Sequence, residues 1–253
     1  MCAAQVEIWT DVDGVMTTDP KLCPEARVIR KMSFDEAAEL AHFGAKVLHP
    51  ATLAPAMREG IPVYVLNSRQ PEGEGTEISA RARSGDAVRA ITAKKSLAVV
   101  EIESTQAVDS ELLRKVYAAF DRHLCAVDVI AASLGRVSLL VSSTAPLPAI
   151  AAELGATASV RWESHKALVC LVGENLQRQA EVATRVFAAV DDLSVRVVSA
   201  GPADRTISFL VGEEKVQESV QRLHGLIFGK RAPAPDWGEV SVAFCQAGFS
   251  PAV

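Results

Sequence analysis

The chain has 253 residues, of which 49% are hydrophobic and 23% are charged, and its formal net charge is −5. These proportions are typical of globular proteins and exclude a disordered, collagen-like or coiled-coil chain. At about 100–200 residues per domain, the length predicts one large domain or two smaller ones. The sequence shows no basic cluster of the kind that binds nucleic acid. Its longest uncharged stretch, residues 137–152, is too short to span a bilayer.

Five cysteines are scattered along the chain without any Cys-x-x-Cys spacing: Cys2, Cys23, Cys125, Cys170 and Cys245. This pattern indicates neither a disulfide framework nor a zinc site, so we expect a reducing compartment and no metal centre. The first residues lack the basic and apolar regions of a secretion signal. We therefore expect a cytoplasmic protein that binds neither nucleic acid nor membranes.

Residues 1–67 alternate between strand and helix patterns, which predicts an α/β layer. The predicted elements are a strand at 6–9, a helix at 33–44, a helix at 52–59 and a strand at 61–66. Ser33 and Glu36 have the spacing of a capping box, and Gly44 is placed to end the first helix. Residues 68–86 are polar and rich in Gly, which predicts a linker or a domain edge.

The rest of the chain contains an internal duplication with an offset of 68 to 70 residues. For example, Val137–Val141 (VSLLV) resembles Ile207–Val211 (ISFLV). Each copy shows the order strand, helix, two strands, helix, which is typical of ferredoxin-like units. Two copies indicate a duplicated domain rather than a solenoid. We therefore predict four parts: an α/β unit at 1–80, repeat units at 81–162 and 163–229, and a loose tail at 230–253.

The motif that follows the first strand, Thr10 to Gly14 (TDVDG), allows two interpretations. Asp-x-Asp-Gly after a strand is the signature of haloacid dehalogenase-type phosphatases, in which Asp11 would be the nucleophile and Asp13 the general acid. Ser68, at the end of a later strand, mimics that family's second motif. That chemistry also requires an acidic pair for magnesium, and the only adjacent Asp pair, at 191–192, lies within a repeat. The phosphatase is kept as a remote alternative.

A longer match extends over residues 5–228. The segments EIWTDVDGVMTTDPKLCPEARVI and MSFDEAAELAHFGAKVLHPATLAPAMREGIPVYVLN, then Gly75-Thr76 and the duplicated units, resemble the C-terminal part of the aspartate kinases. The resemblance implies a combined α/β and α+β fold, in which a partial amino-acid-kinase domain precedes two ferredoxin-like βαββαβ ACT domains. It implies that ATP and L-aspartate give 4-phospho-L-aspartate, the first step of lysine, threonine and methionine biosynthesis. ATP, as Mg-ATP, would be a co-substrate, with no tightly bound cofactor.

The resemblance also assigns residues to two sites. Nucleotide contacts are implied at Thr10, Asp11, Met16, Lys21, Lys46 and Val47. Contacts to a lysine or threonine effector are implied at Ser104, Thr105, Asp109, Asp128 and Ser133. Lys21 stands where the family has arginine, which keeps the charge but loses the bidentate fork. Structural interpretations stay open as well, with Thr10 and Asp11 as turn formers, Lys46 as a cation at a helix end, and Asp128 as an exposed strand residue.

Two glycine-rich segments of the family are absent from this sequence: Lys-Phe-Gly-Gly-Thr-Ser, and the Gly-Arg-Gly-Gly-Ser-Asp that precedes WTDVDG. Such loops hold phosphates and amino acids on backbone amides. We therefore expect a kinase that is incomplete by itself: a truncated gene product, half of a split enzyme, or a regulatory subunit. Its expected partner is a second copy, in a homodimer through the ACT domains, or a separate N-terminal catalytic half. The alternative is a non-enzymatic, amino-acid-sensing or assembly ACT subunit. The ACT units of this sequence depart from the family pattern at Ala200 and Thr206. A pair of ACT domains that has lost effector binding and keeps only a structural role is therefore a further open interpretation.

Overall fold

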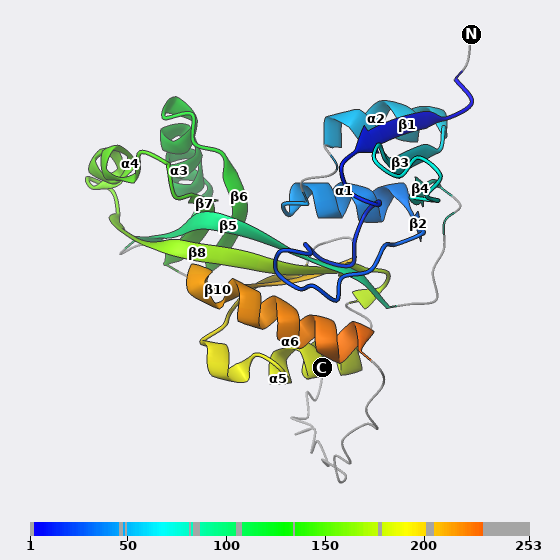
Figure 1. The fold of residues 1–253 in the computed structure, drawn as a ribbon. Helices are drawn as coiled ribbons and strands as arrows, with labels where there is room; N and C mark the ends of the chain where they lie inside the picture. The colour runs from blue at the N-terminus through cyan, green and yellow to red at the C-terminus, as the bar shows by residue number, and fades with distance from the viewer. Residues whose placement is uncertain are drawn as a thin grey trace, which may run out of the picture.

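A computed structural model describes residues 3–45, 48, 50–80, 82, 87–104, 108–133, 135–176, 179–200 and 205–229. The first part of the chain forms β1 (Val6–Thr10), β2 (Lys31–Met32), α1 (Phe34–His42), α2 (Pro50–Glu59), β3 (Val63–Asn67) and β4 (Thr76–Ile78). The second part forms β5 (Val88–Glu103), α3 (Ser110–Arg122), β6 (Val127–Ser133), β7 (Arg136–Ser142), α4 (Leu147–Leu154), β8 (Ser159–Gly173), α5 (Ala180–Ala188), β9 (Arg196–Ala200), β10 (Thr206–Gly212) and α6 (Val216–Phe228) (Figure 1). The predicted tail at 230–253 lies outside the described residues.

The first sheet has the strand order β1-β3-β4-β2, with β1 parallel to β3. The predicted capping box is present at the start of α1, where Ser33 and Glu36 bond to each other's backbone amides. β4 is a correction to the sequence analysis, because it lies inside the segment predicted as a linker and pairs with both β2 and β3. Its three residues are too few to show a period-2 pattern, so no sequence signal marked this strand.

Gly75 and Thr76 hold the first sheet to the long loop between β1 and β2. The buried Thr76 hydroxyl accepts from the Val15 amide at 2.8 Å and donates to the Ile29 carbonyl at 2.6 Å. Gly75 has a φ of +62°, and a Cβ at this position would lie 2.2 Å from the Val65 carbonyl oxygen. The Gly-Thr pair therefore has a structural cause: one residue must lack a side chain and the next must carry a small hydroxyl.

The second sheet has six strands in the order β6-β7-β5-β8-β10-β9. Its two central strands, β5 and β8, are antiparallel and run through both halves of the sheet. The first half pairs β5 with β7 through residues 97–103, whereas the second half pairs β8 with β10 through residues 166–172. The start of β5, residues 88–94, pairs with the end of β8 and so completes the second half. The first part of β5, which lies within the first predicted repeat unit, therefore belongs to the sheet of the second.

Helices cover this sheet on both sides. Alternate residues of β8, namely Ala167, Val169 and Leu171, pack in one core with α5 and α6, whereas Cys170 and Val172 face a second core with α1. In Figure 1, α1 and α6 accordingly lie on opposite sides of the β5–β8 pair. A third core joins α3 and α4 to the first half of the sheet. The kinase-like part is thus packed directly onto the repeat units.

Charged contacts hold the start of α1 on the second sheet. Arg89 of β5 forms an ion pair with the buried Glu36 of α1 at 3.5 Å, and Arg205 binds Asp35 at 2.8 Å. Breaking a buried pair by removing one partner leaves an uncompensated charge, which is strongly destabilising. The buried Arg89–Glu36 pair therefore holds the first turn of α1 over the second sheet, and the more exposed Arg205–Asp35 pair adds a weaker contact.

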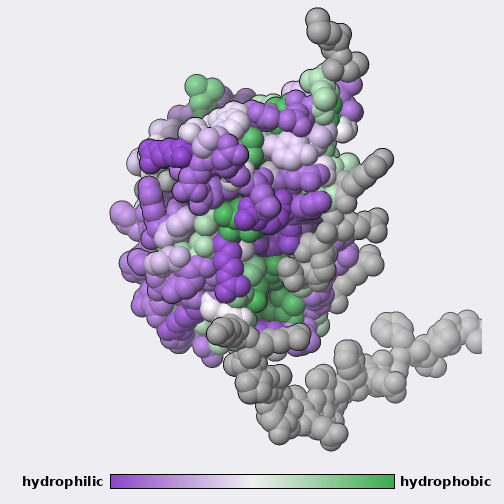
Figure 2. All heavy atoms as spheres, turned by 45° about the vertical axis from the view of Figure 1, so that its right-hand side comes forward, coloured by the Kyte–Doolittle hydropathy of each residue, from purple (hydrophilic) through white to green (hydrophobic). Residues whose placement is uncertain are grey.

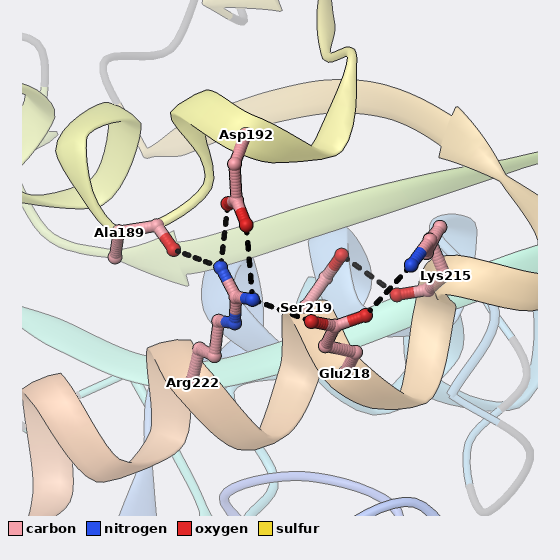
Figure 3. Close-up of polar contacts among 6 residues, drawn as sticks. All are labelled: Ala189, Asp192, Lys215, Glu218, Ser219 and Arg222. Carbon is pink, nitrogen blue, oxygen red and sulfur yellow. Dashed lines mark hydrogen bonds and ion pairs between the residues drawn. The ribbon is translucent and has the colours of Figure 1, made fainter.

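Arg222 holds α6 to the turn after α5 (Figure 3). Its guanidinium donates to both carboxylate oxygens of Asp192, at 2.6 and 3.1 Å, and also contacts Glu218. Hydrogen bonding to Arg222 lowers the pKa of Asp192. Asp192 is one member of the acidic pair that the phosphatase interpretation would require for magnesium, and here it is engaged by an arginine.

The surface is mostly hydrophilic on the face shown in Figure 2, with hydrophobic side chains visible in a narrow central band. Within the described residues, six large hydrophobic side chains are exposed: Trp9, Met57, Tyr117, Leu124, Ile130 and Trp162. Among the described residues, no helix has the length and apolar character needed to cross a membrane.

The two substitutions Gly75→Ala and Gly60→Ala test the role of Gly75. Both glycines have a positive φ, but a Cβ at Gly60 would meet nothing within 4 Å. We expect Gly60→Ala to lower the free energy of unfolding by about 1–2 kcal/mol through backbone strain alone. Gly75→Ala should cost about 1–3 kcal/mol more, because the methyl group overlaps a carbonyl. Chemical denaturation measures both values, and equal losses would contradict this role.

Candidate functional site

The carboxyl ends of the parallel strands β1 and β3 meet at one edge of the first sheet. Thr10 and Asp11 end β1, and the Thr10 hydroxyl lies 3.4 Å from an Asp11 carboxylate oxygen. The Ser68 amide and hydroxyl both donate to the Thr10 carbonyl, at 2.8 and 2.9 Å. Asn67 donates to Asp13 at 2.6 Å. In open α/β sheets, ligands bind outside the carboxyl ends of parallel strands, so this edge is the candidate site.

The loop after β1 runs from this edge to the second sheet. Met16 forms a β-bridge with Val28, and the Thr17 carbonyl accepts from the Ile91 amide of β5 at 2.8 Å. At the tip, the exposed Lys21 amide donates to Asp19, while Leu22 and Cys23 pack against the core of α6. The loop therefore extends away from the sheet edge and is fixed at its tip by α6.

The predicted nucleotide residues divide into three groups. Thr10 and Asp11 lie together at the sheet edge, whereas Met16 and Lys21 lie further along the loop. Within the described part of the chain, no hydrogen bond or ion pair joins Lys21 to Thr10 or Asp11. Lys46 and Val47 lie outside the described residues.

The buried Thr17 side chain connects the loop to α6. Its hydroxyl oxygen accepts from the Arg27 amide at 2.9 Å and lies 3.0 Å from the His224 Nε2 atom. Since the oxygen accepts from Arg27, its proton is available to donate to a neutral His224 ring. Burial lowers the pKa of His224, and the nearby Arg27 lowers it further, against the opposing charge of Glu25. His224 is 2% exposed, so the structure favours its neutral form.

The predicted effector residues lie in two places. The Ser104 amide donates to the Gly135 carbonyl at 2.9 Å, beside Ser133 at the end of β6. Asp128 is at the other end of β6, five residues from Ser133, which is about 16 Å along a strand. Within one chain, these residues do not line a single small pocket.

The effector contacts predicted at Asp109 and Thr105 have different outcomes. Asp109 is the N-cap of α3, where its carboxylate accepts from the Leu112 amide at 2.8 Å. Thr105 lies outside the described residues. Asp128 itself accepts a hydrogen bond from Lys94 at 2.6 Å.

The phosphatase interpretation gains no metal site from this geometry. Among the described residues, no group of three His, Cys, Asp or Glu side chains is arranged to hold a metal ion. Asp13, the general acid of that interpretation, is bonded to Asn67.

Comparison with known proteins supports the kinase resemblance. A model of the amino acid kinase family matches residues 1–67, and a model of the ACT domain matches residues 169–226. The lysine-sensitive aspartokinase 3 of Escherichia coli is 35% identical over 235 residues, which are 89% of this chain and 52% of that protein. The chain is thus similar to aspartokinases along most of its own length. Chloroplastic aspartokinase 2 of Arabidopsis thaliana is 33% identical over 88% of this chain and 44% of its own length.

The solved aspartokinase structures agree with this fold. E. coli aspartokinase III in complex with aspartate and ADP covers 89% of this chain with a TM-score of 0.81. The same enzyme with lysine and aspartate gives a TM-score of 0.78. The predicted fold class and the resemblance to aspartokinases are thereby confirmed. The chain spans about half the length of these relatives.

Three residues at the contacts between the parts were missed by sequence reasoning: Thr17, Lys94 and His224. The partners of Thr17 and Lys94 lie 207 and 34 residues away along the chain. No local sequence pattern could have predicted the Thr17–His224 and Lys94–Asp128 contacts, because each forms only when distant helices, strands and loops have packed together.

The pH dependence of stability tests the Thr17–His224 contact. Because the folded-state pKa of His224 lies below its ordinary value of 6.5, the unfolded state binds the proton more tightly. The contribution to stability is therefore fully present above about pH 6.5 and is lost as the pH falls below it. We expect the melting temperature of His224→Gln to fall less between pH 7 and pH 5 than that of the wild type. His165→Gln, at an exposed histidine, is the control and should follow the wild type. Parallel curves for His224→Gln and the wild type would contradict the contact.

Proposed function

We propose that this chain provides the nucleotide-binding edge and the regulatory ACT part of an aspartate kinase. In the reaction, ATP transfers its terminal phosphoryl group to L-aspartate, which gives 4-phospho-L-aspartate. The observation that carries the proposal is the contact of Thr10 with Asp11 at the carboxyl end of β1, beside the parallel strand β3, in a chain 35% identical to E. coli aspartokinase 3. Because the solved E. coli enzyme holds aspartate and ADP, we extend ATP, with Mg²⁺, to this chain as the phosphoryl donor.

The side chains at this edge suit the sugar and base of a nucleotide better than its phosphates. The Asp11 carboxylate is exposed and accepts hydrogen bonds, so it matches hydroxyl or amino groups. Lys21 is exposed on the loop, where a cation can neutralise phosphate charge. Phosphoryl transfer depends mainly on positioning and on such charge neutralisation. We keep Met16, Lys46 and Val47 as further proposed contacts.

An open sheet edge supports the proposal that the chain does not phosphorylate aspartate by itself. In the described residues, β1 is an outer strand that pairs with β3 alone, and its Trp9 side chain is 48% exposed. An outer strand presents unpaired N–H and C=O groups that can pair with another segment. We infer that an N-terminal catalytic half pairs along β1. The outer strand β6 is the corresponding candidate for a homodimer through the ACT units.

A lysine or threonine effector is part of the proposal. The E. coli relative is named lysine-sensitive, and one of its structures contains lysine. For this chain, we propose that Asp128 binds the effector's ammonium group, since a carboxylate pairs with it by charge-assisted hydrogen bonds. Two further points stay predictions. They are the domain boundaries at residues 80, 162 and 229, and the cytoplasmic location of the protein.

The second candidate function is a sensing subunit without catalysis. One observation on the described residues favours it: the ACT part has a six-stranded sheet with helices packed on both of its halves, whereas the kinase-like part has four strands of at most five residues. In this case the chain would bind an amino acid and act on a separate catalytic chain.

Ligand-dependent melting of the full chain distinguishes the two functions. Under the kinase proposal, Mg-ADP should raise the melting temperature, and Asp11→Asn should abolish this rise. Asp121→Asn, at an exposed aspartate of α3, is the matched control and should keep it. ATP and L-aspartate added to the chain alone should yield no ADP above background.

Two results would contradict the kinase proposal. One is stabilisation by lysine or threonine with no response to Mg-ADP, which would favour the sensing subunit. The other is hydrolysis of a generic phosphate ester that Asp11→Asn abolishes, which would favour the phosphatase.

A further inference from the structure

Two irregularities in the second sheet bring Lys94 and Asp128 together. In β6, Val127 pairs with Val141 and Val129 pairs with Leu140, so Asp128 is the extra residue of a bulge. In β5, the register also shifts after Lys94, where Ser96 has a φ of +58°. Bulges change the direction of a side chain and are common next to functional sites. Here two of them place a cation and a carboxylate in contact across the end of β7.

The contact is a short, half-buried ion pair. The Lys94 Nζ atom lies 2.6 Å from Asp128 Oδ1, and the side chains are 35% and 21% exposed. Partial burial reduces the solvent screening of such a pair compared with one at the open surface. Lys95, the next residue, is exposed. Asp128, whose carboxylate is proposed to bind the ammonium group of an effector, is therefore already bound to the ammonium group of Lys94 in the same chain.

The end of α1 rests on β5, the strand of Lys94. The Phe43 carbonyl accepts from the Thr92 hydroxyl at 3.3 Å. A Cβ on Gly44 would lie 3.2 Å from the Ala93 carbonyl oxygen and 3.4 Å from the Lys94 Cα. The Phe43 ring packs against a cluster that Val129, next to Asp128, also contacts. The turn after α1, which leads to the proposed nucleotide contacts at 46 and 47, thus touches the strand of Lys94 and shares a hydrophobic cluster with the strand of Asp128.

We propose that Lys94 is a positioning residue that couples Asp128 to the turn at Phe43–Ala45. An amino acid whose ammonium group binds Asp128 displaces the Lys94 ammonium, because both require the same carboxylate. Loss of the ion pair loosens β5 at Lys94 and with it the turn that rests on it. Linkage is reciprocal, so a ligand that orders this turn favours the intact Lys94–Asp128 pair and weakens amino-acid binding. This inference rests on the proposed function for the effector role of Asp128.

Amide hydrogen exchange of the full chain tests the coupling without any ligand. Lys94→Met and Asp128→Asn should each speed exchange at Phe43–Ala45 about fivefold, the scale expected for loss of one ion pair of this exposure. The double variant should exchange no faster than either single one, because the two residues act through one interaction. Lys94→Arg keeps the charge and should restore the wild-type rate. Lys95→Met is the matched control and should leave the rate unchanged.

Exchange in a distant strand separates coupling from general destabilisation. The amide of the buried Phe209 in β10 should keep its wild-type rate in every variant. The coupling is overturned if Lys94→Met leaves exchange at Phe43–Ala45 unchanged. It is equally overturned if the effects of the two single variants add, or if Phe209 speeds up to the same extent.

L-Lysine and L-threonine, added separately to the wild type, test the effector step. Either amino acid that binds Asp128 should speed exchange at Phe43–Ala45 as Lys94→Met does, and should have no effect on Asp128→Asn. If the variants show the coupling and neither amino acid changes exchange, the effector role of Asp128 in the proposed function fails while the coupling stands.

Discussion

The antiparallel pairing of β5 with β8 is the constraint on which the rest of the structure depends. Each strand passes through both halves of the six-stranded sheet, so neither half can form without the other's chain segment. Alternate residues of β8 also supply two different cores, one with α5 and α6 and one with α1. Since a strand's successive side chains point to opposite faces, a shift of one residue would exchange these cores. The pairing therefore fixes the ACT units and the docking of the kinase-like part together.

That docking places the candidate nucleotide edge and the candidate effector carboxylate within one packed body. The charged pairs Glu36–Arg89 and Asp35–Arg205 hold the start of α1, and the contacts of Phe43 and Gly44 with β5 hold its end. The loop after β1 is held separately, through Thr76 at its base and α6 at its tip. A structural change in β5 can be transmitted to the nucleotide edge through backbone segments that pack directly against each other, without an intervening flexible segment. This packing is the physical basis for the coupling proposed above.

The sequence predicted the parts of this chain well where the signal is local. The capping box at Ser33 and Glu36, the alternation of strand and helix, and the duplicated pattern after residue 86 each have a short-range cause, and the structure contains each of them. β4 was assigned to a linker because a three-residue strand carries no periodicity, and only its pairing with β2 and β3 defines it. The candidate sites were named through family resemblance, and their roles stay predictions for this chain.

By itself, the sequence determined the resemblance to aspartokinases, the fold class and the residues at the end of β1, because motifs and periodicity depend on neighbours in the chain. Only the tertiary structure decided that residues 88–94 complete the sheet of the second repeat unit. It also decided that Lys94 binds Asp128 and that Thr17 meets His224, over separations of 34 and 207 residues. Such pairs leave no local pattern, since hydrophobic burial brings the elements together and polar partners are fixed only by the packing that results.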